Sequence, residues 1–335
     1  MDVQEWFEKY KFKCTSFSNI KRLVELKKIN KKKKISLVIP TLNEEETVGK
    51  VISILKGKLM DKYKLLDEII VVDSGSTDNT EKVAKKAGAK FFLSEKHLKK
   101  YGKAKGKGEN LWKSLYLAQG DIIVFLDGDI KNMHPRFVYG LVGPLLTMKE
   151  IGFTKAFYKR PLKVGEKVEP LGGGRVTELL IRPLFNMYFP RLSGFIQPLS
   201  GEYAGKRELL ERIPFFTGYG VETGMLIDIQ KKFGLRKIAQ VDLFKRVHRN
   251  QSLASLSNMS FGILQVFAKR ANTLGKLILV KDIRRNYRII ERKKENGKIV
   301  YGLKEKIIKE KQRPPIITIE EYRKKFRREP KWVYV

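Results

Sequence analysis

The sequence predicts an α/β fold built on a mostly parallel sheet. Between residues 35 and 126, short apolar runs alternate with longer segments in which apolar residues recur at helical spacing. Each apolar run is as short as a strand and is followed by polar residues or glycine. Strands that alternate with helices in this way place the helices on the faces of a parallel sheet. At 335 residues, the chain is long enough to bury a full core.

The individual elements follow from the same pattern. Proline at position 40 ends the first apolar run, and Gly88 ends the second helix. The expected strands cover residues 35–39, 68–73, 91–93 and 121–126. The expected helices cover residues 44–56, 78–86, 109–117, 175–188 and 222–232.

Four regions are expected along the chain. Residues 1–34 form an N-terminal helical extension, in which Asp2 is the expected N-cap and Trp6, Phe7 and Tyr10 fall at helical spacing. Residues 35–133 and 134–255 are the two halves of one α/β domain. Residues 256–335 are expected to form a helical, basic C-terminal tail.

The net charge of +34 suggests an anionic partner. Nucleic acid, an anionic membrane and small polyanions are the three candidates. We expect no nucleic acid, because basic and aromatic residues are not interleaved in a binding motif. Stable membrane insertion is not expected either, because no apolar run approaches about 20 residues. The single cysteine, Cys14, and the lack of an apolar signal-peptide core predict a cytoplasmic protein.

Ligands of parallel sheets bind at the carboxyl ends of the strands, which selects the loops after Ile39, Val72 and Leu126. The last of these loops carries Asp127-Gly128-Asp129. Two carboxylates around a tight turn suit Mg²⁺ or Mn²⁺, which takes oxygen ligands and neutralises a departing diphosphate. A pair of aspartates on a turn can also occur by chance.

The other two loops begin helices. Residues 40–46 and 73–78 offer free helix N–H groups and acidic side chains to a nucleoside, although the same residues also suit simple helix capping. Gly106-Lys107-Gly108 allows close backbone approach and places a lysine near a phosphate. Its spacing differs from that of a Walker P-loop, which argues against a simple NTPase.

Two later segments complete the candidate sites. Gly172-Gly173-Gly174-Arg175 leads into a helix with Thr177 in its first turn, which suits either an anion site or a flexible hinge. In the segment from Arg246 to Asn250, a neutral His248 can complete the metal site that Asp129 begins, or can be purely structural.

Together these motifs resemble the retaining GT-A glycosyltransferases, and more narrowly the glucosyl-3-phosphoglycerate synthases. The resemblance runs from about Ser36 to about Asn250. Its specificity comes from the order of PTLNEEE, VVDSGSTDNT, GKGENLWKSL, DIIVFLDGDI, FYKRPL, GGGRVTELLIRPL, QPLSGEYAGKRELL, GYGVETGMLID and VHRN. The later motifs carry the resemblance to the narrower family, because nucleotide-sugar transferases in general share only PTLNEEE, VVDSGSTDNT and the Asp-x-Asp.

The resemblance implies a mixed α/β sheet of GT-A type, with residues 35–133 binding the nucleotide sugar and residues 134–255 the acceptor. It implies transfer of glucose from UDP-glucose to 3-phosphoglycerate with retention, a divalent cation (Mg²⁺ or Mn²⁺) and a homodimer. The product is the precursor of the compatible solute glucosylglycerate. Donor binding is implied for Pro40, Thr41, Leu42, Glu44, Ser74, Lys107, Asp127, Gly128, Leu199, Tyr219, Glu222 and Arg246.

Acceptor binding is implied for Gly174, Arg175, Thr177 and Asn250. The implied metal ligands are Asp129 and His248, with Asp127 as a second carboxylate. Glu222, Leu199 and Asp129 are the expected catalytic residues, and Glu222 is expected to orient the sugar. One departure is Gly128, where the family usually has serine, a side chain that metal binding does not need.

Three alternatives remain open at this point. A transferase of the same fold would use GDP-glucose or GDP-mannose, or would act on a lipid phosphate. A nucleic-acid-binding protein is the alternative from another class, and the charge alone motivates it. The tail beyond about residue 280 lies outside the resemblance and carries no transferred function.

Overall fold

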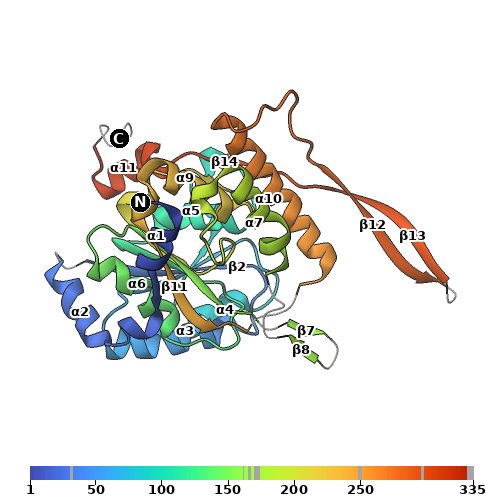
Figure 1. Cartoon of the computed structure of the whole chain (residues 1–335). Coiled ribbons are helices and arrows are strands. Elements are labelled where there is room, and N and C mark those ends of the chain that lie inside the picture. The colour runs from blue at the N-terminus through green and yellow to red at the C-terminus, as the bar shows by residue number, and fades with distance from the viewer. Residues whose placement is uncertain are drawn as a thin grey trace.

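The computed structural model describes residues 1–30, 33–160, 162–164, 167–169, 174–247, 251–295 and 298–329. Within these residues, eight strands form one mixed sheet in the order β1-β11-β6-β9-β5-β2-β3-β4. Helices cover both faces of this sheet (Figure 1). The strands are β1 Lys11–Lys13, β2 Ile35–Thr41, β3 Glu68–Asp73, β4 Lys90–Leu93, β5 Ile122–Phe125, β6 Phe153–Lys159, β9 Tyr203–Lys206 and β11 Ile238–Lys245.

The first half of the domain confirms the predicted alternation. Strands β2, β3, β4 and β5 are parallel, and β2, β3 and β5 carry buried Val, Ile and Leu side chains, as strands covered on both faces must, whereas the edge strand β4 is only partly buried. The intervening helices are α3 Val48–Leu55, α4 Thr80–Lys86 and α5 Lys107–Leu117.

Helix α3 begins later than the predicted residue 44. The backbone N–H of Glu44 donates to Oγ1 of Thr80 at 2.8 Å, and that of Glu45 donates to Oδ2 of Asp78 at 3.1 Å. These bonds hold residues 44 and 45 in a turn against the segment that follows β3. After Leu55, the helix continues as a wider turn, Lys56–Lys62.

In the second half, β9 lies antiparallel between β5 and β6, while β6 and β11 run parallel to each other. The predicted helices at 175–188 and 222–232 are present, the first as Thr177–Ile181 with α7 Arg182–Tyr188, and the second as α9 Val221–Phe233. The remaining elements here are α6 Arg136–Thr147, α8 Arg207–Leu210, β10 Phe215–Phe216 and the small β7 Leu162–Val164 and β8 Lys167–Glu169 pair.

The N-terminal extension is helical only in part. Asp2 caps α1 (Val3–Lys9), as predicted, by accepting a hydrogen bond from Glu5 N at 2.8 Å, and α2 covers Ile20–Ile29. Between these helices, however, β1 pairs with β11 and extends the main sheet. Trp6 is fully buried and donates from Nε1 to Ile238 O at 2.8 Å. The extension is therefore part of the domain core.

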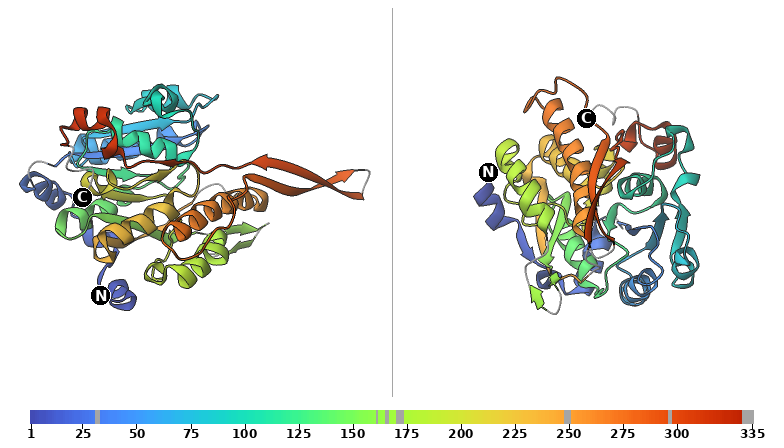
Figure 2. Two further views of the ribbon diagram at one scale, coloured as in Figure 1. Left: turned by 90° about the horizontal axis from the view of Figure 1, so that it is seen from above. Right: turned by 90° about the vertical axis from the view of Figure 1, so that its right-hand side faces the viewer.

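The prediction of a helical tail at 256–335 is wrong for residues 286–313, although helix α10 (Leu253–Thr273) and a short helix near the C-terminus are present. Strands β12 (Asn286–Glu295) and β13 (Lys298–Ile307) form an antiparallel hairpin, which we call the arm. It projects far from the body of the molecule (Figure 2). The missed sequence signal is Asn296-Gly297, a dipeptide typical of two-residue hairpin turns that itself lies outside the described residues.

The chain then returns to the body, where β14 (Gln312–Arg313) pairs with β10 and α11 (Glu320–Phe326) buries Tyr322. Helix α10 likewise buries Val266 and Phe267 against the body. The C-terminal region is thus integrated into the domain. In the described ranges, the structure contains no helix that is long and apolar enough to span a bilayer.

Candidate active site

A cavity of about 640 Å³ opens where the carboxyl ends of β2, β3 and β5 meet the start of α5. It occupies the edge of the sheet that the sequence selected. Sixteen of the predicted site residues line it: Pro40, Thr41, Leu42, Glu44, Ser74, Lys107, Asp127, Gly128, Asp129, Gly174, Arg175, Thr177, Leu199, Tyr219, Glu222 and Arg246. The other two predicted residues, His248 and Asn250, lie outside the described residues, as do Gly172 and Gly173.

The loops after β2 and β3 are held together by Asp73. Its carboxylate accepts hydrogen bonds from Thr41 Oγ1 at 2.7 Å and from the backbone N–H groups of Gly75 and Ser76 at 2.8 and 2.7 Å. Asp73 is buried and does not line the cavity, whereas Ser74 does. The aspartate therefore fixes the turn, and its neighbour faces the ligand.

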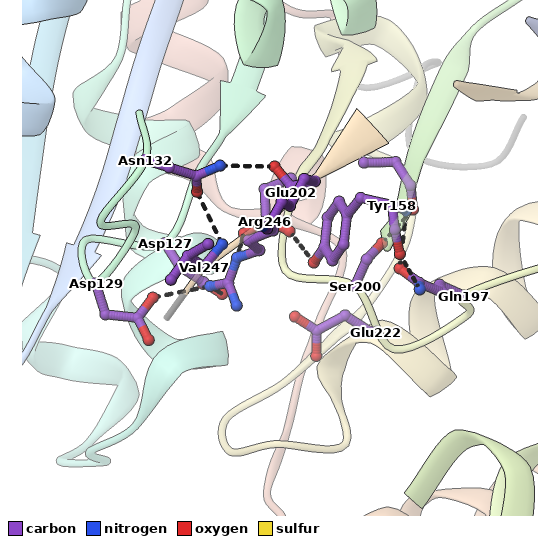
Figure 3. Close-up of polar contacts among 12 residues, drawn as sticks. Asp127, Asp129, Asn132, Tyr158, Gln197, Ser200, Glu202, Glu222, Arg246 and Val247 are labelled. Atoms are coloured by element: carbon purple, nitrogen blue, oxygen red, sulfur yellow. Dashed lines mark hydrogen bonds and ion pairs between the residues drawn. The ribbon is translucent and has the colours of Figure 1, made fainter. Parts of the chain in front are cut away.

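The floor of the cavity is a cluster of opposite charges. Nζ of Lys107 lies 2.7 Å from Oδ1 of Asp127 and 3.0 Å from Oε1 of Glu222. Nη2 of Arg246 lies 3.0 Å from Oδ2 of Asp127 and 2.8 Å from Oδ1 of Asp129 (Figure 3). Each carboxylate of the Asp-x-Asp motif is therefore matched by a protein cation.

These contacts shift the protonation equilibria. Burial opposes charge on the Lys107 ammonium, but Asp127 and Glu222 outweigh it and hold the pKa of Lys107 well above its usual range. Burial likewise opposes ionisation of Asp127, but Lys107 and Arg246 hold the pKa of Asp127 well below its ordinary value. For Asp129, burial and the neighbouring Asp127 raise the pKa against the opposing effect of Arg246.

Sequence reasoning missed the group behind Arg246. Nε of Arg246 lies 2.8 Å from Oε1 of Glu202, which is fully buried in the QPLSGEY segment. The hydroxyl of Tyr158 donates to the other oxygen of Glu202 (Figure 3). Glu202 thus orients Arg246 from below the cavity. Its only sequence signal was its place in a family motif, because it pairs with residues far along the chain.

Glycine is required at one point of the cavity wall. A Cβ on Gly201 would lie 2.1 Å from Oδ2 of Asp127 and 2.6 Å from Nζ of Lys107. The backbone between Leu199 and Glu202 therefore runs directly against the charge cluster. Only glycine permits that approach.

The rest of the cavity wall is basic and apolar. Arg175 follows Gly174, whose φ of 91° lies in the left-handed region that favours glycine. Arg160 joins Arg175 in the lining. Helix α10 contributes the apolar residues Leu256, Met259 and Ile263, which sequence reasoning assigned to the tail. An anionic ligand with a short carbon chain suits this mixture.

The chemistry of the donor set fits a divalent cation. Asp127 and Asp129 provide hard carboxylate oxygens that are partly open to the cavity and already converge on one positive group, the Arg246 guanidinium. Among the described residues, no group of three or more His, Cys, Asp and Glu side chains forms a complete metal site. The third predicted ligand, His248, lies outside them.

Comparisons with known proteins agree with this geometry. The sequence model of glycosyl transferase family 2 matches residues 36–213. The glucosyl-3-phosphoglycerate synthase of Petrotoga mobilis is 55% identical over 323 residues, covering 96% of this chain and 98% of the relative. That of Mycolicibacterium smegmatis is 50% identical, covering 70% of this chain and 77% of the relative. The chain belongs to the glucosyl-3-phosphoglycerate synthase family.

Solved structures show the same GT-A fold. The glucosyl-3-phosphoglycerate synthase of Mycobacterium tuberculosis, in complex with Mn²⁺, UDP and phosphoglyceric acid, superposes with a TM-score of 0.75 at 39% identity, covering 89% of this chain and 95% of that one. The mannosyl-3-phosphoglycerate synthase of Rubrobacter xylanophilus superposes with a TM-score of 0.83 at 36% identity, covering 94% and 97%.

Proposed function

We propose that this protein transfers glucose from UDP-glucose to 3-phosphoglycerate, releasing UDP and glucosyl-3-phosphoglycerate with retention at the anomeric carbon. The observation that carries this proposal is that predicted donor residues and the predicted acceptor residues Gly174, Arg175 and Thr177 line one cavity. The mycobacterial relative, whose structure holds Mn²⁺, UDP and phosphoglyceric acid, shares this fold at 39% identity.

At the donor end, Lys107 and Arg246 stabilise the negative charge of the departing diphosphate. Both cations are already in place and largely removed from water, so little reorganisation is needed as charge develops. A divalent cation held by Asp127 and Asp129, with His248, supplies further positive charge to the same leaving group. Pro40, Thr41, Leu42, Glu44 and Ser74 bind the nucleoside.

At the acceptor end, Arg175 and Thr177, with Gly174 and Asn250, bind the phosphate and carboxylate of 3-phosphoglycerate. Their contribution is mainly positioning, because they hold the acceptor hydroxyl near the sugar. Glu222 orients the glucose together with Tyr219 and Leu199. Attack on the face from which the diphosphate leaves accounts for retention without a protein nucleophile.

A second candidate is a mannosyltransferase that uses GDP-mannose. The specific observation in its favour is the Rubrobacter xylanophilus mannosyl-3-phosphoglycerate synthase, which has the higher TM-score of the two solved structures described above. In both candidates the loops after β2 and β3 bind the nucleoside, so the residues of these loops determine whether uracil or guanine is accepted. The more similar sequences favour glucose, since the Petrotoga mobilis glucosyl enzyme reaches 55% identity over nearly the whole chain.

The decisive assay measures nucleoside diphosphate release by the purified protein with Mg²⁺ or Mn²⁺. UDP-glucose, GDP-glucose and GDP-mannose are compared, each with and without 3-phosphoglycerate. We expect release only with UDP-glucose, 3-phosphoglycerate and metal together. If GDP-mannose is the one donor that supports release in the presence of 3-phosphoglycerate, the donor is reassigned to GDP-mannose. If no donor supports release, other acceptors are tested next, beginning with lipid phosphates.

We also propose that the enzyme acts as a homodimer in the cytoplasm and that its product leads to glucosylglycerate, a compatible solute. Support for the dimer comes from the arm, where Ile290, Tyr301, Leu303 and Ile307 are between 60% and 76% exposed. Exposed apolar stripes of this kind mark contacts with other proteins. Cys14 is a free, buried thiol, which suits a reducing compartment.

A further inference from the structure

The segment that follows the arm lies behind two walls of the cavity. We call residues 309–313 the strap; it joins β13 to the body and includes β14. On one side it contacts residues 217–220, next to the cavity-lining Tyr219 and Glu222. On the other side it contacts residues 101–109, which include the cavity-lining Lys107. Strap residues themselves do not line the cavity.

Glu310 holds the first wall. Its buried carboxylate accepts hydrogen bonds from Gly218 N at 2.8 Å and Gly220 N at 3.1 Å. The niche is walled by glycines, because a Cβ on Gly218 would lie 2.3 Å, and one on Gly262 2.9 Å, from Oε1 of Glu310. A carboxylate with two backbone donors in so tight a niche fixes the turn that presents Tyr219.

Arg313 holds the second wall. Its guanidinium, 2% exposed, makes a two-point contact with the fully buried Glu109, from Nε at 2.7 Å and from Nη2 at 2.8 Å. It also donates to the carbonyl oxygens of Tyr101 and Gly102, the latter at 2.9 Å. These contacts fix both the glycine-rich loop and the first turn of α5. Lys107 begins that turn.

The two walls are also tied to each other through Thr217. Glu109 N donates to Thr217 O at 3.0 Å, and Thr217 N donates to Lys311 O at 2.9 Å. Lys311 N returns a hydrogen bond to Thr217 Oγ1 at 3.1 Å. The strap, the start of α5 and the loop before α9 therefore form one unit. Lys107 and Glu222, 3.0 Å apart, project from that unit into the cavity.

We propose that Glu310 and Arg313 are positioning residues for glucosyl transfer, which set the placement of Lys107, Tyr219 and Glu222 around the donor. The inference rests on the proposed function, and it gives the tail a role that the family motifs do not contain. In the described part of the chain, the side-chain hydrogen bonds of Glu310 and Arg313 reach donor-side segments and none reaches Arg175 or Thr177, whereas the backbone N–H of Glu310 donates to Gln265 on α10. Replacing the two side chains is therefore expected to act on the donor, while the backbone contact with α10 remains.

The test compares Glu310→Ala with Glu305→Ala. Glu305 lies five residues earlier, is exposed, and among the described residues pairs with the arm residues Arg288 and Asn286, so it is a matched control. For Glu310→Ala we expect the KM for UDP-glucose to rise about tenfold and kcat to fall about tenfold, with the KM for 3-phosphoglycerate unchanged. For Glu305→Ala we expect wild-type constants.

A purely structural role would give a different result. Loss of folded protein lowers kcat per mole of chain and leaves both KM values unchanged, so that outcome would overturn the proposal, as would equal rises in both KM values. Arg313→Lys and Glu310→Gln are the conservative variants. We expect each to raise the donor KM by about threefold. A lysine cannot reproduce the two-point contact, and the two N–H groups bond to different oxygens of Glu310, only one of which remains an acceptor in the amide.

These conservative variants decide the matter if Glu310→Ala does not fold. Wild-type donor KM values in both would overturn the proposal. Calorimetric titration of UDP in the presence of Mn²⁺ provides a readout that is independent of the acceptor, and we expect UDP to bind about tenfold more weakly to Glu310→Ala. If the wild type binds UDP but does not use 3-phosphoglycerate, the proposed function fails while the inference stands. Equal UDP affinity in wild type and Glu310→Ala removes the inference alone.

Discussion

Arg246 and Arg313 are both buried to 2% exposure, and both pair with carboxylates, yet their surroundings differ. Two partners of Arg246, Asp127 and Asp129, are partly open to the cavity. Glu109, the partner of Arg313, is fully buried, and backbone carbonyls take the remaining donors. In the open cluster, Arg246 with Asp127 and Asp129, these ion pairs can be replaced by contacts with a charged ligand. In the closed cluster, Arg313 with Glu109, a ligand cannot reach the charges, so the pair can only stabilise the fold.

The largest expected effect comes from breaking the open cluster at its metal-binding side. Asp129→Ala removes one of the two carboxylates that converge on Arg246, and we expect kcat to fall by about 10³-fold because leaving-group stabilisation is lost. UDP release with Mn²⁺ measures this effect. Asp61→Asn, an exposed aspartate that pairs with Lys56, is the control. Undiminished turnover would remove the metal assignment.

A smaller and more selective effect is expected at the acceptor end. Arg175→Ala removes a guanidinium that lines the cavity and donates to Gln251 O at 3.1 Å, a group able to bind a phosphate or carboxylate at two points. We expect the KM for 3-phosphoglycerate to rise about 10²-fold, with the KM for UDP-glucose within about twofold of wild type. Initial rates with each substrate varied in turn measure the split, and the exposed Arg191→Ala serves as control. A rise in the donor KM alone would move Arg175 to the donor site.

Breaking the closed cluster of Arg313 and Glu109 should lower the stability of the folded protein. Arg313→Met leaves the Glu109 carboxylate with Lys113 at 3.1 Å as its remaining cation, and we expect a loss of about 3–5 kcal/mol in the free energy of unfolding. The double variant Glu109→Met, Arg313→Met should recover part of that loss, since apolar side chains can replace a buried ion pair but the buried Lys113 also loses its carboxylate partner. Denaturant unfolding of the four proteins completes the cycle. Simple additivity would mean that the pair is not coupled.

The difference between the clusters also explains what the sequence could predict. The strands, the helices around them and sixteen residues of the cavity follow from local patterns and from family motifs. These patterns work because buried parallel strands are continuous apolar runs and because ligands bind where such strands end. Asp127 and Lys107 stand in short motifs, so they were visible without knowing their partners.

The strap and Glu202 were not visible, because their partners lie far along the chain. Arg313 meets Glu109 across 204 positions, and a lone arginine in a basic tail carries no local signal. The arm was missed for another reason. Helical expectation was extended from α10 over residues 286–307, although Asn296-Gly297 indicates a hairpin.

A weaker, pH-dependent effect is expected at Lys155, which is buried beside the cavity floor and donates to Ser200 O at 2.7 Å. Burial lowers the pKa of Lys155 from 10.5 to about 7. Between these values the unfolded chain binds a proton that the folded chain has released, so this lysine makes stability rise with pH through that window.

Lys155→Met should therefore be more stable than wild type near pH 7, and that advantage should shrink toward pH 10. Urea unfolding at both pH values measures the difference, with the exposed Lys82→Met as control. A gap between variant and wild type that is the same at both pH values would contradict the shift.

The smallest effect on turnover is expected from substitutions in the arm, which projects away from the body of the molecule (Figure 2). Ile290 pairs directly with Leu303, and Tyr301 and Ile307 lie on the same face of the hairpin by alternation. An isolated two-stranded hairpin is at best marginally stable in water, and an exposed apolar face on this arm is typical of a contact surface. If the proposed dimer forms through this face, Ile290→Ser with Leu303→Ser should give a monomer in sedimentation equilibrium, with turnover within about twofold of wild type. Ile289→Ser, on the opposite face, is the control.

Salt sharpens this last prediction. Residues 286–307 carry seven lysines and arginines against three glutamates, so two arms repel each other electrostatically. Added salt screens that repulsion and leaves the apolar contact intact, and the dimer should therefore tighten as salt rises. An arm that bound nucleic acid would behave in the opposite way, because its affinity would fall steeply with salt. The sign of the salt dependence thus separates a self-association surface from the nucleic-acid surface that the net charge alone would suggest.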